Sequence, residues 1–176
     1  DLSMLTLQFD QNALKDKNRF ELLITDENEL SGLPESARDA AAMLAKSKDK
    51  NGWLFNLSAP SYIPFMRYSD KRDLREKMYR EYMSVGNKGD EFDNKDIIKK
   101  IVNIRLEIAQ LMGFKNYAEY ALEHTMAKNS ANVYKLLNQL LEAYKPIAIN
   151  EYNAVEGFAL GTEKENITVM PWDWSY

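Results

Sequence analysis

Histidine and cysteine, two residue types that often carry enzyme chemistry, are scarce or absent in this chain. It contains a single histidine, His124, which Thr125 and Met126 follow, and it contains no cysteine. A helix-borne zinc site of the H-E-x-x-H type needs two histidines one turn apart, because both imidazoles must reach one metal from one helix face. One histidine excludes that motif. We expect His124 to pack against a helix rather than to bind a metal.

An acidic cluster in the middle of the chain is a second place where chemistry could occur. Asp90, Glu91, Asp93 and Asp96 lie close together in the sequence. They lack the ordered D-x-D-x-D-G spacing and the closing glutamate of a calcium loop. Asp93 or Asn94 stands directly before a long periodic segment, where a short polar side chain can cap the first backbone N–H groups of a helix. Helix capping is therefore the interpretation that we favour.

Other catalytic patterns find no support in the sequence. No G-x-S-x-G elbow accompanies the histidine, and the seven glycines are spread singly rather than gathered into a phosphate-binding loop. Five aromatic residues could line a peptide groove, although such clusters are more often part of a core because rings bury large areas. They are Trp53, Phe55, Tyr62, Phe65 and Tyr68. We predict no catalytic, cofactor-binding or metal-binding residue in residues 1–176.

Composition and charge narrow the class of protein. Hydrophobic residues make up 45% of the chain and charged residues 28%, as in ordinary globular proteins. The net charge is −4, with Lys and Arg scattered among acids, which argues against a nucleic-acid surface. No apolar run approaches the roughly 20 residues of a membrane span. The lack of cysteine suits a reducing compartment, and we expect a cytoplasmic location.

Apolar residues at three- and four-residue steps predict that helices dominate the chain. The longest predicted helices are residues 1–18, 70–85, 94–112 and 130 to about 160. Pro146 lies inside the last of these, where it predicts a kink or the start of a second helix. A shorter helix is expected from Pro34, and another after Asn116, with Glu119 in capping-box spacing.

Two short runs, residues 20–25 and 53–57, are the strand candidates. Paired as an antiparallel ribbon they would be marginal alone, so the ribbon must pack on helices. Pro60 and Pro64 follow, and they leave at most a short helix over residues 65–68. The predicted fold class is mainly α: a multi-helix, bundle-like fragment with one short two-stranded antiparallel ribbon.

Three stretches of the sequence carry a resemblance to a known family. They are residues 30–42 (LSGLPESARDAAA), residues 52–86 and residues 171–176 (PWDWSY). Together they resemble the zinc oligopeptidases, a family that includes thimet oligopeptidase, oligopeptidase A and the bacterial peptidyl-dipeptidase or dipeptidyl carboxypeptidase. The resemblance extends over essentially all 176 residues and looks nearest to peptidyl-dipeptidase.

The resemblance implies a metallopeptidase in which helical subdomains form the walls of a deep channel. It implies short peptides as substrates, release of C-terminal dipeptides, and zinc as the cofactor of the full-length protein. The family's zinc helix and its third ligand, a glutamate, lie downstream of the part that this chain resembles. Residues 1–176 are accordingly expected to be a single helical, non-catalytic fragment without a cofactor of its own, and to form channel wall and scaffold.

The resemblance also implies the partners of the chain. They are the remainder of the parent polypeptide, with its catalytic helices, and peptide substrates of the parent; no nucleic acid and no membrane are expected. Trp172 and Trp174 predict an apolar patch that the parent covers and that could cause self-association of the fragment, unless the tail folds back on its own helices. The alternative function is a stand-alone helical protein-interaction module.

Overall fold

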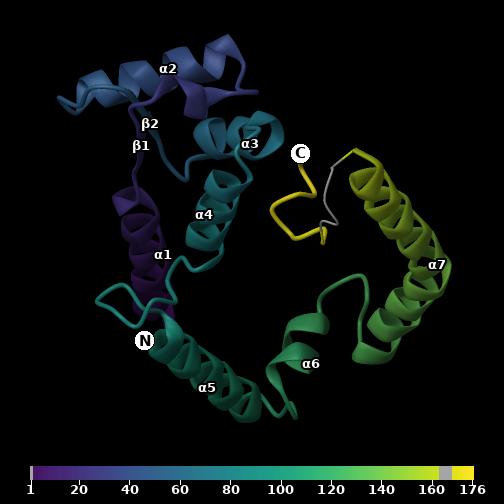
Figure 1. Cartoon of the computed structure of the whole chain (residues 1–176). Helices are drawn as coiled ribbons and strands as arrows, with labels where there is room; N and C mark the ends of the chain where they lie inside the picture. Colours follow the sequence, from purple (N-terminus) through teal and green to yellow (C-terminus); the bar gives the residue numbers. More distant parts are fainter. Residues whose placement is uncertain (1, 163–167) are drawn as a thin grey trace. The chain divides into compact units, whose positions relative to one another are not determined.

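The computed structural model describes residues 2–162 and 168–176, and it is dominated by helices (Figure 1). The predicted mainly α class is confirmed. The elements, in chain order, are α1 (Leu2–Arg19), β1 (Leu22–Ile24), the 3-10 helix η1 (Glu27–Leu30), α2 (Glu35–Ser47), β2 (Trp53–Phe55), α3 (Ala59–Tyr68), α4 (Arg72–Met83), α5 (Lys95–Leu111), α6 (Tyr117–Leu122) and α7 (Ser130–Thr162).

The predicted antiparallel ribbon is present between β1 and β2. Leu22 pairs with Phe55, and Ile24 pairs with Trp53. Side chains alternate along β1, so that Leu22 and Ile24 are buried while Leu23 between them is 41% exposed. The ribbon packs against α2, which supplies the support that a two-stranded ribbon needs.

Helix α3 is longer than the sequence predicts. Pro60 lies in its first turn, where no intrahelical partner is lost, and Pro64 lies inside it. The proline at 64 removes one backbone hydrogen bond, but the next two residues, Phe65 and Met66, are buried in the core. Tertiary packing therefore holds a helix through a residue that should end it, and the expected break is wrong.

Helix α7 continues through Pro146 as one element of 33 residues. Figure 1 shows it as a single curved ribbon. The alternative that a second helix begins at Pro146 is wrong. Proline lacks one backbone N–H, but the hydrogen bonds of the turns before and after it remain and hold the helix together.

Contacts divide the chain into two compact units. The ribbon unit comprises Thr6–Ile97 and Met170–Tyr176, and the α7 unit comprises Asp1–Leu5 and Ile98–Val169. Helices α1 and α5 contribute residues to both units.

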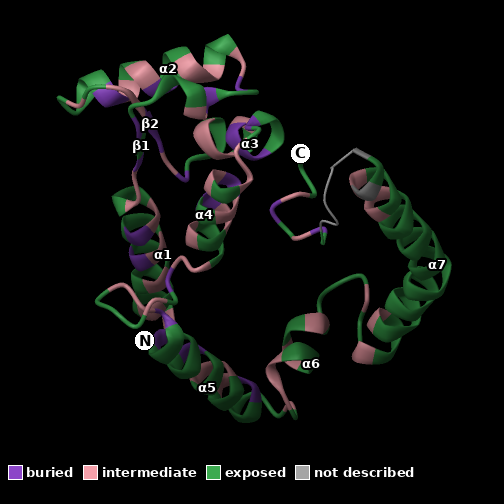
Figure 2. Cartoon of the chain, in the orientation of Figure 1, coloured by how far each residue is buried: buried purple, intermediate pink, exposed green. Residues whose placement is uncertain are grey.

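The hydrophobic core of the ribbon unit lies where the ribbon, α2, α3 and α4 meet, and its buried residues appear purple in Figure 2. The rings of Phe55 and Phe65 meet edge to face, with centroids 4.8 Å apart. The core consists of Leu22, Ile24, Leu30, Leu33, Ala41, Phe55, Leu57, Phe65, Met66, Met78 and Trp172.

Buried polar groups fasten α1 to the loop before α5. The side-chain amide of Asn12 donates to Asn94 Oδ1 at 3.1 Å, and Asn94 Nδ2 donates to the carbonyl of Phe9 at 3.0 Å. The fully buried Asp16 accepts the backbone N–H of Gly86 at 2.7 Å. Gly86 has a φ of +70°, a conformation that favours glycine. The Asp16 carboxylate therefore binds a turn in which a side chain at position 86 would strain the backbone.

We predict that Met78→Ala lowers the free energy of unfolding of the ribbon unit by about 3 kcal/mol, because it deletes a fully buried side chain. The matched control is Met43→Ala, also on a helix but 73% exposed, which should cost less than about 0.5 kcal/mol. Denaturant titration followed by tryptophan fluorescence measures both, since all three tryptophans lie in this unit. Equal losses for the two variants would contradict the described core.

Candidate functional site

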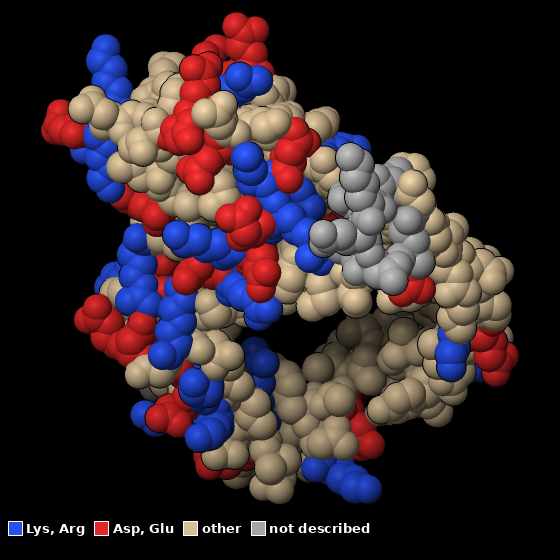
Figure 3. Space-filling view, in the orientation of Figure 1, with Lys and Arg blue, Asp and Glu red and all other residues tan. Residues whose placement is uncertain are grey.

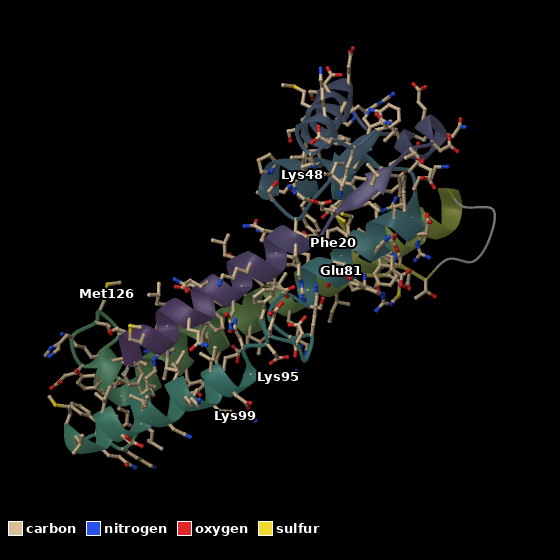
Figure 4. The ribbon with its side chains drawn as sticks, turned by 90° about the vertical axis from the view of Figure 1, so that its left-hand side faces the viewer. Phe20, Lys48, Glu81, Lys95, Lys99 and Met126 are labelled. Atoms are coloured by element: carbon tan, nitrogen blue, oxygen red, sulfur yellow. The ribbon has the colours of Figure 1, made fainter. Side chains whose placement is uncertain are left out.

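The one histidine stands apart from any packed surface. His124 lies in the turn between α6 and α7 with its side chain 88% exposed, and its Nε2 is 3.6 Å from Glu123 Oε2. Met126, in the same turn, is 98% exposed, and Figure 4 shows its side chain outside the ribbon. The expectation that His124 packs against a helix is therefore wrong, because α6 ends at Leu122 and the chain turns away.

Metal-ligating residue types do not converge in the part of the chain that is described. Within residues 2–162 and 168–176, no three His, Cys, Asp or Glu side chains form a group that could hold a metal ion. None of the described helices combines the length and apolar character that a membrane span requires. Figure 3 shows Lys and Arg interleaved with Asp and Glu on the visible face.

One residue of the acidic cluster, Asp93, bonds the start of α5. Asp93 Oδ1 accepts the backbone N–H of Lys95 at 2.9 Å, and Oδ2 accepts that of Gly89 at 2.6 Å. The Lys95 ammonium, together with these N–H groups, lowers the pKa of Asp93 to about 2. Asp90 binds Arg19 and the backbone N–H of Phe92, which lowers its pKa. Capping is confirmed, with Asp93 as the residue that bonds the helix end.

The five aromatic residues mostly belong to the core. Phe55 and Phe65 are buried in it, and Trp53 and Tyr62 pack against it. The ring of Tyr62 stacks on Tyr82 with centroids 4.4 Å apart, and burial raises the pKa of Tyr62 to about 12. Tyr68, at the end of α3, is 45% exposed. The core interpretation is thus correct for four of the five.

A charged arrangement ties the C-terminal segment to α4, and we call it the clasp: Arg72, Arg75 and Asp173. Arg72 donates from Nε to Asp173 Oδ1 at 3.0 Å and from Nη2 to Oδ2 at 2.7 Å. Arg75 Nη2 donates to Asp173 Oδ1 at 3.0 Å. Charge-assisted hydrogen bonds from planar guanidinium groups also fix the orientation of the carboxylate.

Arg75 is 3% exposed, so its charge must be satisfied by the protein. Besides Asp173, its Nη1 donates to the carbonyl of Ser69 at 2.6 Å and its Nε to that of Trp172 at 3.2 Å. The ring of Tyr176 lies against the guanidinium, 4.0 Å from centroid to Cζ. One buried arginine therefore joins the turn after α3, the helix α4 and the C-terminal segment.

A second hydrogen-bonded connection lies beside the clasp. The Tyr176 hydroxyl donates to Asp70 Oδ1 at 2.9 Å, and Ser31 Oγ donates to Asp70 Oδ2 at 2.6 Å. These two hydrogen bonds, the Ser31 bond first, lower the pKa of Asp70. The carboxylate thus links the C-terminal segment to the turn after η1.

Trp172 belongs to the core of the ribbon unit. It is 5% exposed, and the guanidinium groups of Arg80 and Arg72 lie 4.9 and 5.9 Å from its ring. Trp174 is 47% exposed. The tail therefore folds back on its own helices, and the expectation of one exposed patch bearing both rings is wrong for Trp172. No local sequence signal points to this, since Arg75 and Trp172 are 97 residues apart.

The hydrogen bonds and charges of the clasp favour the ionised form of Asp173 and suit a structural role. Burial opposes ionisation of Asp173, but hydrogen bonds from Arg72, the Met170 N–H and Arg75 outweigh it and lower the pKa of Asp173. Both carboxylate oxygens accept hydrogen bonds from these donors. A carboxylate held in this way is suited to positioning a chain segment rather than to accepting a proton from a substrate.

Comparison with known proteins identifies the family. Residues 65–176, which include the clasp, match Peptidase family M3. The chain belongs to this family. The expected membership among the oligopeptidases is thereby confirmed.

Relatives within family M3 align over nearly the whole chain. Oligopeptidase A from Haemophilus influenzae is 40% identical over 98% of this chain, and oligopeptidase A from Escherichia coli is 37% identical over 99%. Dipeptidyl carboxypeptidase from Escherichia coli is 27% identical over 100%. The identities are thus higher with oligopeptidase A than with the dipeptidyl carboxypeptidase, to which the sequence looked nearest. In each case the chain spans 26% of the relative's length.

We predict that Asp173→Asn lowers the free energy of unfolding of the ribbon unit by about 2 kcal/mol at neutral pH, because buried Arg75 loses a charged acceptor. The pKa of Asp173 is lowered in the folded chain, so its contribution is complete above the ordinary value of 3.8 and is lost as pH falls through the folded pKa. The gap between wild type and variant should therefore narrow in acid.

The control is Asp39→Asn, an exposed carboxylate on α2, which should leave the free energy of unfolding nearly unchanged at every pH. Urea titrations between pH 6 and pH 2.5, followed by tryptophan fluorescence, give the comparison. A gap between wild type and Asp173→Asn that widens on acidification would show that the clasp is not an ionic tie.

Proposed function

We propose that this chain is a non-catalytic helical segment of a zinc metallopeptidase that hydrolyses short peptides, and that it forms part of the wall and scaffold of the substrate channel. The observation that carries the proposal is membership of Peptidase family M3 in a chain with a single, 88% exposed histidine. The names oligopeptidase A and dipeptidyl carboxypeptidase describe peptidase activity in the relatives.

Zinc does not fit the residues of this chain that the structure describes. His124 Nε2 lies 3.6 Å from Glu123 Oε2, and the described residues hold no group of three possible ligands. A catalytic zinc commonly has three protein ligands and an open position for water. Any zinc of the complete peptidase would therefore be held by other residues, and we derive no catalytic step from this segment.

The geometry of the ribbon unit supports a scaffold role. A core with fully buried residues, the Asn12–Asn94 hydrogen bond and the clasp make it a fixed support. A peptide channel needs rigid walls, because the groups that bind a substrate must be held to within about 0.5 Å of their productive positions. Channel wall is thus the role we propose for the segment, with peptides as ligands of the complete protein.

The mode of cleavage and the location are finer parts of the proposal. The higher identity to oligopeptidase A supports cleavage of short peptides in general, whereas release of C-terminal dipeptides has only the 27% likeness to dipeptidyl carboxypeptidase behind it. A cytoplasmic location is supported by the absence of cysteine.

We predict that the isolated chain binds no stoichiometric zinc and cleaves no peptide, because it cannot assemble a three-ligand site with an activated water. Metal analysis after dialysis should find far less than one zinc per chain, and incubation with short peptides should yield no chelator-sensitive products. One tightly held zinc per chain, or dipeptide release that a chelator abolishes, would disprove this.

A chimera tests the role itself. Replacing the aligned quarter of Haemophilus influenzae oligopeptidase A with this chain should give an enzyme that still cleaves short peptides, since the segment serves as scaffold. His124→Ala in the chimera should change kcat/KM less than about twofold, whereas loss of a group that supports a metal site costs roughly ten- to a hundredfold.

The activity of the chimera also distinguishes the proposed scaffold role from the second candidate function, a stand-alone interaction module. A chimera that is folded by circular dichroism yet inactive would mean that the segment cannot serve in a peptidase. A hundredfold loss with His124→Ala would mean that the segment does carry chemistry.

A further inference from the structure

Helix α7 carries a continuous apolar surface that the described residues leave exposed. We call it the apolar arc; each of its side chains is between 42% and 65% exposed. It consists of Tyr134, Leu136, Leu137, Leu140, Leu141, Tyr144 and Ile147. Figure 2 colours nearly all of α7 as exposed.

The arc is one side of an amphipathic helix. With 3.6 residues per turn, its positions cover roughly half of the circumference over four turns. Polar residues occupy the other half: Lys135, Asn138, Glu142 and Lys145. A surface helix normally turns such an apolar face towards a core. Helix α6 packs against α7 but leaves the arc uncovered.

We propose that the apolar arc of α7 is the surface on which the remainder of a full-length family M3 peptidase packs, through an apolar helical face of that same polypeptide. This inference rests on the proposed function. The aligned segment is 26% of oligopeptidase A, so relatives carry about three quarters of their chain beyond it, which is ample to supply the covering face. Contiguous exposed apolar patches commonly mark interaction surfaces.

The charges on α7 argue against a lipid surface as the occupant. Helices that lie on anionic membranes are rich in Lys and Arg on the polar face. The described part of α7 carries Lys135 and Lys145 against Glu142, Glu151 and Glu156, which is a net acidic set. The arc itself lacks charged residues, as a packed protein interface requires at its centre.

Trp172 is not part of this contact surface. Trp172, expected beforehand to mark the covered face, lies in the core of the ribbon unit and is 5% exposed. The ring of Trp172 therefore does not contribute to such a contact, which the inference places on the apolar arc of α7.

Thiol labelling tests the inference, because the chain has no cysteine of its own. Leu141→Cys places a thiol in the arc, and Glu142→Cys places the matched control on the neighbouring polar face. Each is made in the isolated chain and in the oligopeptidase A chimera, and mass spectrometry of the α7 peptide reports maleimide labelling at that position alone. Leu137→Cys and its neighbour Asn138→Cys provide a second pair should the first disturb folding.

Both thiols should react at similar rates in the isolated chain. In the chimera we expect Cys at 141 to react at least about tenfold more slowly, because labelling then needs local opening, while Cys at 142 changes less than about twofold. If the thiol at 141 reacts at the same rate in the isolated chain and in an active chimera, the inference is overturned and the proposed function stays intact. A folded but inactive chimera would remove both.

Protection at 141 in the isolated chain would also overturn the inference. If the protection grows with protein concentration, the occupant is a second copy of the chain. If it needs anionic phosphatidylserine vesicles, the occupant is a lipid surface.

Discussion

The buried guanidinium of Arg75 is the constraint on which the ribbon unit depends. A charge that is 3% exposed is tolerated only with a full set of acceptors, and this one uses the Ser69 carbonyl, the Trp172 carbonyl and Asp173. These acceptors come from the turn after α3 and from the C-terminal segment. Satisfying one charge therefore fixes the relation of two parts of the chain that are about one hundred residues apart.

Polar contacts within the ribbon unit hold the two places where the chain passes to and from the residues of the α7 unit. The chain leaves the ribbon unit after Ile97, just beyond Asn94, whose amide is bonded to Asn12 and to the Phe9 carbonyl. It returns at Met170, whose N–H donates to Asp173. Hydrogen bonds have a directional requirement that apolar packing lacks, so these contacts fix both segments within the ribbon unit.

Family membership and local chemistry give complementary answers about function. The match to Peptidase family M3 includes α4, the clasp and α7, whereas among the described residues no three His, Cys, Asp or Glu side chains form a group that could hold a metal ion. A peptidase needs rigid walls as much as reacting groups, because orientation of the substrate accounts for a large part of catalysis. The role that we propose for the chain is therefore positioning.

The sequence by itself determined the elements whose signals are local. The isoleucine spacing of α5, the ribbon of β1 and β2, and the Asp93 cap follow from residues a few positions apart, and the lone histidine already excluded a paired-histidine site. Only the tertiary structure decided the rest. Helix α3 runs through Pro64 because its neighbours are buried, and His124 is exposed because α6 stops short of it. Trp172 is buried because its ring packs in the core, while its carbonyl accepts a hydrogen bond from Arg75, 97 residues away. Pairing over such a distance leaves no periodic trace in a sequence.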